Sequence, residues 1–406
     1  MKKLNLYYIG THILFWAGYA IAWSYTAVYL QERGYNSQVV GRVTGVGAVI
    51  SVLLQPMLAK MIAKNKKMSN QGNVLLLKTA TIVMAVLMLF HLPGIYTVAV
   101  LFTLLAAFEA SIPSVLNSIA MEANNAGHEV NYGFARGMGS VGYAVFSLFL
   151  GYAVSFWGAE SLMYLYIGTS VLTVVVAGLL KNASEKLAEE PREESASEVS
   201  NLQQTEKDSS LLSLFKKYAC LKYFLPASVL LFMSHNMVCV FLPMIIEHAG
   251  GDSSKLGVAL AISAMVEFPV MSYFVKLSEK VRTEKLLVIS AIFFTIKSGV
   301  ALVASDVAVV YLAQFLQFGG FALFTPASVY FINMALEEED RNVGQAILGA
   351  CTLGLGGTFG NVLGGMLLEN TGLGVMLTVS TVFCMAAMML MMLSRKSYLK
   401  MNLKKV

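Results

Sequence analysis

The chain has 406 residues, of which 57% are apolar and 13% are charged. Soluble domains have roughly half apolar and a quarter charged residues, so a water-soluble enzyme of this length is excluded. The formal net charge is +5, but Lys and Arg are scattered between apolar runs and form no basic module, which excludes a nucleic-acid-binding protein. We expect a polytopic protein embedded in a lipid bilayer.

The apolar runs follow one another along the chain, and each is long enough to cross about 30 Å of hydrocarbon as a helix. Six precede and six follow one charged segment. The predicted helices lie near residues 6–31, 37–62, 73–92, 94–121, 133–156 and 160–180, then 222–246, 255–277, 285–303, 306–336, 343–368 and 372–393. The predicted fold is therefore an all-α membrane protein with twelve transmembrane helices in two six-helix halves.

The charged segment, residues 182–217, is rich in Glu and cannot bury enough apolar area to fold alone. It predicts a cytoplasmic acidic linker between an N-terminal half, residues 1–181, and a C-terminal half with a cytoplasmic tail, residues 218–406.

Basic residues in short loops predict the orientation, because such loops stay on the cytoplasmic side. If the spans alternate, one side holds Lys2, Lys3, Lys64, Lys66, Lys67, Lys280, Arg282, Arg341, Arg395, Lys396, Lys400, Lys404 and Lys405. We therefore expect a multi-pass protein of the cell inner (plasma) membrane with both termini in the cytoplasm.

The two halves also resemble each other in sequence. The segment that begins at Pro113 in the fourth predicted span is similar to the one that begins at Pro326 in the tenth, and each precedes a polar loop and a Gly-rich helix. Chance similarity between apolar helices is the alternative. A parallel repeat of six spans is typical of secondary transporters, which bind substrate between their halves near the bilayer midplane.

Charged residues inside spans are candidates for function, because each costs roughly 2.5 to 3.5 kcal/mol at a helix centre. Glu109, Glu267 and Lys297 are deep in their runs, and Arg136 is at the edge of one. Glu109 has Pro113 and Asn117 at i+4 and i+8, which predicts a polar stripe that lines a cavity. The alternatives are that Glu109 snorkels and that Glu267 and Lys297 form a structural ion pair.

The first predicted span carries an aromatic stripe of His12, Trp16, Tyr19 and Trp23. Such a face suits ring-shaped substrates, although helix packing or an interfacial belt also produces it. The deeper pair, Tyr19 and Trp23, is included among the predicted substrate ligands. His235 is interpreted as a packing residue, and so are the glycines between 137 and 142, which lie in an apolar span and not after a strand.

The sequence contains no HExxH, GxSxG or Walker A motif and no cysteine pair at metal-binding spacing. We therefore expect no metal, no cofactor and no catalytic residue. A membrane-embedded enzyme remains an alternative of another class.

The segment Tyr132–Tyr143 resembles the start of the fifth helix in the lactose permease and oligosaccharide–proton symporter branch of the major facilitator superfamily, with the phenylpropionate-permease-like group close by. The resemblance places Arg136 on the sugar-binding arginine and Tyr143 on the aromatic residue that stacks on the sugar. It also matches Glu267 and Lys297 to a sugar-binding glutamate and a basic residue. The coupling residues differ, since Gln314, Gln317, Gly320, Asn236 and Cys239 replace charged or histidine side chains.

The resemblance implies a secondary active transporter that works by alternating access, with proton-coupled uptake of a sugar or oligosaccharide by a monomer. Efflux of amphipathic compounds, or uptake of an aromatic acid or nucleoside, is the alternative. The predicted substrate ligands are Arg136, Tyr143, Glu267, Asn117, Tyr19, Trp23 and Gln317, and the predicted proton-coupling residues are Glu109, Glu267 and Lys297. Because Lys297 is expected beside Glu267, the sequence favours Glu109 as the proton carrier.

Overall fold

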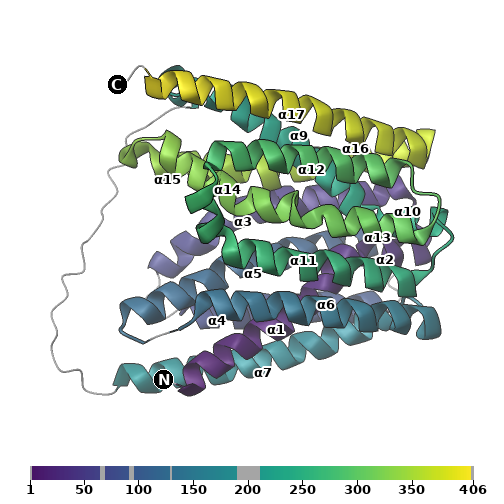
Figure 1. Cartoon of the computed structure of the whole chain (residues 1–406). Coiled ribbons are helices and arrows are strands. Elements are labelled where there is room, and N and C mark those ends of the chain that lie inside the picture. The colour runs from purple at the N-terminus through teal and green to yellow at the C-terminus, as the bar shows by residue number, and fades with distance from the viewer. Residues whose placement is uncertain (1, 65–68, 91–95, 129, 190–210, 404–406) are drawn as a thin grey trace.

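The computed structural model describes residues 2–64, 69–90, 96–128, 130–189 and 211–403. Long helices run side by side through the molecule (Figure 1). The N-terminal half consists of α1 (Lys2–Ser24), α2 (Thr26–Glu32), α3 (Ser37–Lys64), α4 (Asn70–Leu89), α5 (Thr97–Asn125), α6 (Tyr132–Trp157) and α7 (Ser161–Glu189).

The C-terminal half contains more helix breaks than the N-terminal half. It consists of α8 (Leu211–Lys217), α9 (Leu221–Val240), α10 (Leu242–His248), α11 (Ser253–Lys280), α12 (Thr283–Leu302), α13 (Val307–Phe315), the 3₁₀ helix η1 (Leu316–Phe318), α14 (Phe321–Ala335), α15 (Glu338–Gly349), the π-helical η2 (Ala350–Gly356), α16 (Gly357–Thr371) and α17 (Leu373–Leu403).

Twelve spans are present when broken helices are counted together. Eleven stretches in the described residues are long and apolar enough to cross a membrane, and α1 with α2 forms a twelfth that is bent by 51° near Tyr25. The predicted twelve-span fold is thus confirmed. The first, seventh, tenth and eleventh spans were expected to be continuous α-helices, but each of them is broken. Hydropathy does not detect such breaks because they leave the apolar composition of the span unchanged.

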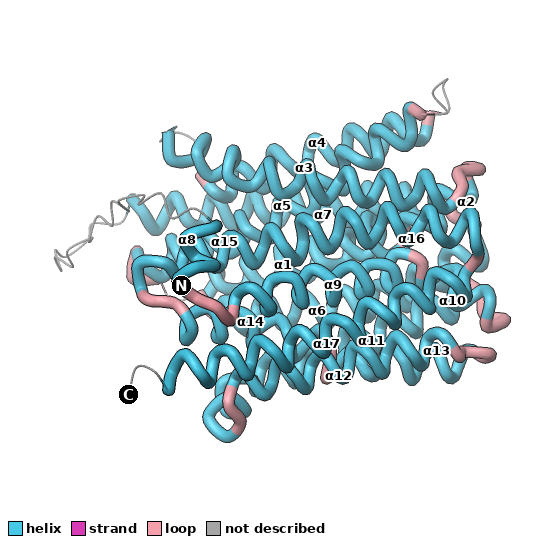
Figure 2. Tube along the Cα trace, turned by 90° about the horizontal axis from the view of Figure 1, so that it is seen from above, coloured by secondary structure: helices cyan, strands magenta, loops and turns pink. Residues whose placement is uncertain are grey.

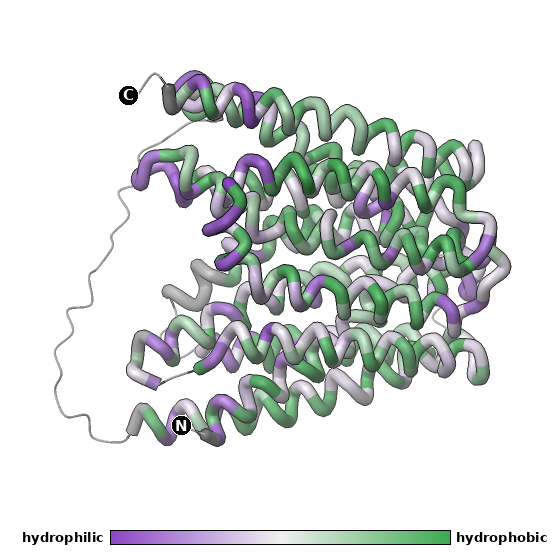
Figure 3. The backbone as a smooth tube through the Cα atoms, in the orientation of Figure 1, coloured by the Kyte–Doolittle hydropathy of each residue, from purple (hydrophilic) through white to green (hydrophobic). Residues whose placement is uncertain are grey.

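Two ends of the bundle can be distinguished. One end of the bundle, here called the termini end, contains the start of α1, the end of α17, α8 and α15 (Figures 1 and 2). The other end, here called the opposite end, contains α2 and α10 (Figures 1 and 2). Lys3, Lys280, Arg282, Arg341, Lys396 and Lys400 are at helix ends on the termini side. Hydrophilic residues gather at α15 and other helix ends, while the middle of the bundle is largely hydrophobic (Figure 3).

Part of the predicted linker lies within helices. The last turns of α7 reach Glu189, and α8 occupies Leu211–Lys217. Lys217 Nζ donates a hydrogen bond of 2.7 Å to Asp340, which joins α8 to α15. Residues 190–210 of the predicted linker, and the basic residues Lys66, Lys67, Lys404 and Lys405, lie outside the described residues.

Equivalent helices in the two halves end in the same way. Gly158 follows α6 with φ of 77°, and Gly372 follows α16 with φ of 89°. This left-handed conformation favours glycine because it has no Cβ. Pro113 in α5 and Pro326 in α14 also occupy corresponding helices. These shared features agree with the internal repeat predicted from the sequence.

Candidate functional site

The hydrophobic core is arranged differently at the two ends of the bundle. At the opposite end, one cluster of buried side chains contains residues of both halves, such as Tyr25 and Val40 with Val238 and Leu256. Towards the termini end, the N-terminal half has its own core around Tyr8 and the C-terminal half has another around Phe224. The halves are therefore joined by packing at the opposite end and have separate cores at the termini end.

Small residues permit this close packing at the opposite end. A Cβ on Gly151 of α6 would lie 2.5 Å from the carbonyl oxygen of Ser253, and a Cβ on Gly257 of α11 would lie 2.5 Å from that of Ser147. On the other side of the bundle, Gly41 of α3 meets the carbonyl group of Asn361 in α16. Any larger side chain at these positions would force the halves apart.

Arg136 of α6 lies over an aromatic ring of its own half. Its guanidinium carbon is 4.0 Å from the ring centre of Trp16, and its Nη1 donates a hydrogen bond of 2.9 Å to Ser140. Gly139, which follows in the glycine-rich segment, leaves the space that the Trp16 ring occupies. The glycine pattern thus positions the arginine through close packing of α6 against α1.

Glu267 of α11 belongs to the other half, and the next residue, Phe268, packs against Gly137 beside Arg136. The charges of Arg136 and Glu267 act on each other across the boundary between the halves. Although both side chains are described, no direct ion pair joins them. The two groups form a pair of opposite charges that a polar ligand could join.

A chain of hydrogen bonds extends from Glu267 into the C-terminal half. Gln317 donates from Nε2 to the Glu267 carboxylate at 3.0 Å, and its side-chain carbonyl accepts a hydrogen bond from Lys297. Gln317 lies in η1, where the span breaks before Gly319 and Gly320. The predicted proximity of Glu267 and Lys297 is therefore achieved through a glutamine and not through a direct ion pair.

The aromatic stripe of α1 is present as an ordered row of rings. Tyr19 stacks on Trp23 with ring centres 5.9 Å apart and planes at 24°, and Trp16 lies 4.9 Å from Tyr19. The indole nitrogens of Trp16 and Trp23 and both ring nitrogens of His12 are buried without a hydrogen-bond partner in the described residues. Buried polar groups are normally satisfied, so these nitrogens are candidates for ligand contact.

Glu109 has an environment that the sequence did not predict. Its Oε1 atom lies 2.6 Å from Nζ of Lys78 in α4 and also accepts a hydrogen bond from the hydroxyl of Tyr166 in α7. Both charged side chains are fully buried within the N-terminal half. Lys78 was overlooked, although it is the only charged residue in the third predicted span, 73–92. The premise that Glu109 lacks a basic partner is thus wrong.

The sequence of this chain is similar to the sequences of known membrane transporters. Residues 6–394 match the family model described as MFS_1 like family. The chain belongs to this family of major facilitator transporters. It is 23% identical to the maltose permease of Geobacillus stearothermophilus over 379 residues, 91% of this chain and 89% of the permease.

Solved transporter structures have the same fold as this major facilitator protein. A mutant of the nucleoside transporter NupG superposes with a TM-score of 0.78 at 16% identity, covering 97% of this chain and 99% of that one. A D-xylose–proton symporter gives a TM-score of 0.67 at 12% identity, covering 96% of each chain. The relatives are transporters and not enzymes, which places this membrane-embedded chain among small-molecule transporters.

The expected polar stripe of the transporter's α5 is divided between two environments. Glu109 is buried against α4 and α7, whereas Asn117 is exposed. The physical reason is that eight residues at 3.6 per turn leave the two side chains about 80° apart around the helix. This corrects the prediction that Glu109, Pro113 and Asn117 share one cavity face.

Two other residues considered in the sequence analysis, Tyr143 and His235, lie in different surroundings. Tyr143 lies in α6 and its hydroxyl hydrogen-bonds to Ser24 of α1, near the stacked Tyr19 and Trp23. His235 stacks on Phe321 at 4.7 Å and 8° and contacts Cys239, so its ring has packing partners. In the described residues, no cluster of three His, Cys, Asp or Glu side chains forms a metal site.

Proposed function

We propose that this transporter carries out proton-coupled uptake of a sugar or oligosaccharide, bound between the halves by Arg136 and Glu267. The observation that carries the proposal is the pair of opposite charges contributed by α6 and α11 without a direct ion pair. A guanidinium donates two parallel hydrogen bonds and a carboxylate accepts them, so neighbouring hydroxyl groups of one sugar ring can satisfy both. The maltose permease relative and the D-xylose–proton symporter neighbour support this substrate class.

The surrounding side chains suit a ring-shaped substrate. Tyr19 and Trp23 offer flat faces on α1, and Tyr143 and Gln317 add polar groups from α6 and η1. Aromatic faces bind the apolar side of a sugar, while unpartnered indole N–H groups donate hydrogen bonds to its oxygens.

A nucleoside is the second candidate. It also contains a sugar ring, and its base would stack on the Tyr19–Trp23 pair. The nucleoside transporter NupG, which has the same fold, supports this candidate.

Alternating access would proceed by opening and closing the two ends of the bundle in turn. The shared core and the glycine contacts close the opposite end, whereas towards the termini end the described residues of each half form a separate core. With the termini in the cytoplasm of an inner-membrane protein, as the basic loops favour, this conformation would admit substrate from the cytoplasmic side. Exposed Asn117 would then lie on the path and not in the binding site.

We assign the proton to Glu267 in place of Glu109. Glu109 lies in a direct, fully buried ion pair with Lys78 inside the N-terminal half. Glu267 reaches Lys297 only through Gln317 and lies between the moving halves, so its surroundings change when they separate. A carboxyl group whose environment changes between states can bind and release a proton.

Substrate counterflow in proteoliposomes tests the substrate class. Vesicles loaded with unlabelled maltose, xylose, uridine or an aromatic acid would be diluted into the same radiolabelled compound. Transient accumulation of maltose or xylose is expected, and Arg136→Lys should reduce it strongly at a substrate concentration near the wild-type Kd. Accumulation of uridine alone would select the nucleoside candidate, and accumulation of the aromatic acid alone would refute a sugar-containing substrate.

A further inference from the structure

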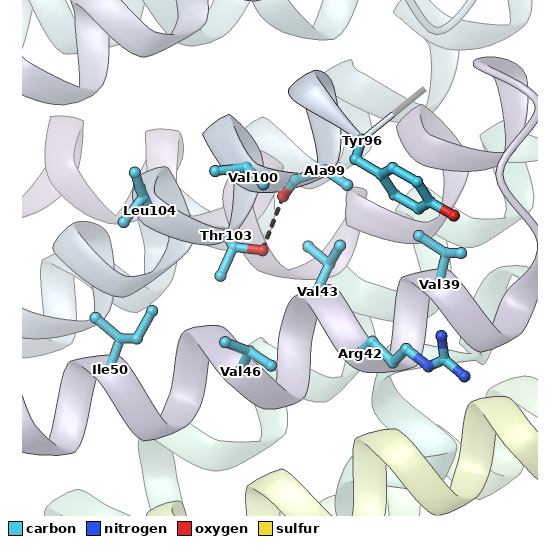
Figure 4. Close-up of a pocket in the computed structure, with 10 residues that line it drawn as sticks. All are labelled: Val39, Arg42, Val43, Val46, Ile50, Tyr96, Ala99, Val100, Thr103 and Leu104. Atoms are coloured by element: carbon cyan, nitrogen blue, oxygen red, sulfur yellow. Dashed lines mark hydrogen bonds between the residues drawn. The ribbon is translucent and has the colours of Figure 1, made fainter. Parts of the chain in front are cut away.

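The N-terminal half has a groove on its outer surface between α3 and α5, towards the opposite end of the bundle. Its volume is about 390 Å³. Val39, Val43, Val46 and Ile50 line it from α3, and Val100 and Leu104 line it from α5 (Figure 4). Val46 and Val100 are 48% and 56% exposed, so the groove opens on the face of the bundle that contacts lipid.

The helix faces explain why the groove is external. On α3, Gly41 and Gly45 pack against α16, and a Cβ on Gly47 would lie 3.4 Å from the carbonyl oxygen of Thr103 in α5. Arg42, Val46 and Val49 lie between these faces and are exposed. The groove is therefore separated from Arg136 and Glu267 by α3 and α5 themselves.

One end of this apolar groove is polar. Arg42 is exposed and makes no ion pair or hydrogen bond with the described residues. Tyr96 is 71% exposed and lies at the same end, whereas Ile50 and Leu104 lie at the other end (Figure 4). Arg42 is five residues inside α3, or about 7.5 Å along its axis, so its side chain can reach the membrane interface. An unpaired cation at that depth attracts an anionic group.

The length of the groove matches one lipid chain. From Val39 to Ile50, α3 rises about 16 Å, close to the roughly 15 Å of hydrocarbon in one leaflet. This face of the bundle is surrounded by bilayer, and phospholipids combine a phosphate that Arg42 can bind with acyl chains of this length. Guanidinium groups bind phosphate through two parallel hydrogen bonds, and an adjacent tyrosine hydroxyl can donate a third.

We propose that the groove between α3 and α5 is a binding site for an anionic phospholipid. The phosphate lies on Arg42 with Tyr96 beside it, and one acyl chain lies along the valine row of α3. A zwitterionic lipid offers the same phosphate, but its amine offsets the charge, so the site prefers a lipid with net negative charge. The assignment is independent of which substrate the transporter carries.

Native mass spectrometry of the full-length transporter tests the site, with phosphatidylglycerol and phosphatidylcholine of identical acyl chains as probes. The wild type should retain phosphatidylglycerol more strongly than phosphatidylcholine. Arg42→Gln should weaken retention of phosphatidylglycerol about fivefold, as expected for one basic residue near a lipid headgroup. Lys255→Gln is the matched control, because it removes an exposed positive charge at the same end, at the start of α11.

Val46→Trp provides a second variant, since it fills the groove and keeps Arg42. It should also reduce phosphatidylglycerol retention, whereas excess inorganic phosphate should leave retention by the wild type unchanged. Equal losses in Arg42→Gln and Lys255→Gln would reduce the effect to net charge and overturn the proposal. Unchanged retention in Val46→Trp would show that the acyl chain lies elsewhere and would overturn it too.

Discussion

The Nζ atom of Lys78 lies 2.6 Å from the Oε1 atom of Glu109, and neither side chain has exposed surface. The pair joins α4 to α5, and Tyr166 extends it to α7. Removing one partner of a buried ion pair leaves an uncompensated charge, which costs about 3–5 kcal/mol, whereas replacing both partners can be neutral. We interpret the pair as holding three helices of the N-terminal half together.

The first prediction follows from this pair. Glu109→Gln should lower the free energy of unfolding by about 3–5 kcal/mol, and Lys78→Met combined with Glu109→Gln should recover most of the loss. Thermal unfolding of the purified protein in detergent, followed through a double-mutant cycle, measures both effects. If the stable double variant failed to accumulate substrate in a pH gradient while still exchanging it, Glu109 would be the proton carrier after all.

The second prediction concerns Glu267. Glu267→Gln keeps the size of the side chain and its ability to accept a hydrogen bond from Gln317, but it cannot bind and release a proton. Uphill accumulation driven by a pH gradient should be abolished at every substrate concentration, while downhill exchange should continue with weaker substrate affinity, because Glu267 is also a proposed ligand. Both are measured in proteoliposomes. Accumulation at the wild-type level would refute the assignment of Glu267.

The third prediction concerns the geometry of Arg136. Arg136→Lys keeps the charge but loses the planar fork that lies over Trp16 and donates two parallel hydrogen bonds. Substrate affinity should fall by about 2 kcal/mol, or roughly thirtyfold. Isothermal titration or a binding-induced shift in the unfolding temperature measures this. Arg282→Lys, in the loop between α11 and α12, is the control and should bind as the wild type does.

The fourth prediction concerns the closed end. Gly151→Val should keep α6 and α11 apart, because even a Cβ there would lie 2.5 Å from the Ser253 carbonyl oxygen. Overpacking costs about 1–3 kcal/mol, so the population closed at the termini end should rise about tenfold. A cysteine introduced at exposed Asn117, in a background without the native cysteines, should then react more slowly with a maleimide.

Gly178→Val provides the control for this measurement, since a Cβ on Gly178 has no neighbour within 4 Å. It should leave the labelling rate of the introduced cysteine unchanged. An equal change in both variants would mean that the glycine contacts do not set the conformational equilibrium.

The sequence alone determined the membrane class, the twelve spans and the repeat, because hydrocarbon thickness fixes span length and composition is read directly from the chain. It also brought out Arg136, Glu267 and the α1 aromatic row, since charged and aromatic residues are conspicuous in apolar runs. Only the tertiary structure decided how these side chains pair.

Three side-chain environments illustrate the difference. Lys78 meets Glu109 from another helix, Gln317 lies between Glu267 and Lys297 where the tenth span breaks, and Arg42 has no partner among the described residues at the end of an apolar groove. Each depends on the rotation of a helix about its axis and on its neighbours. Hydropathy is summed along a window of residues and contains no information about helix rotation or neighbouring helices. The packing of the helices decides both.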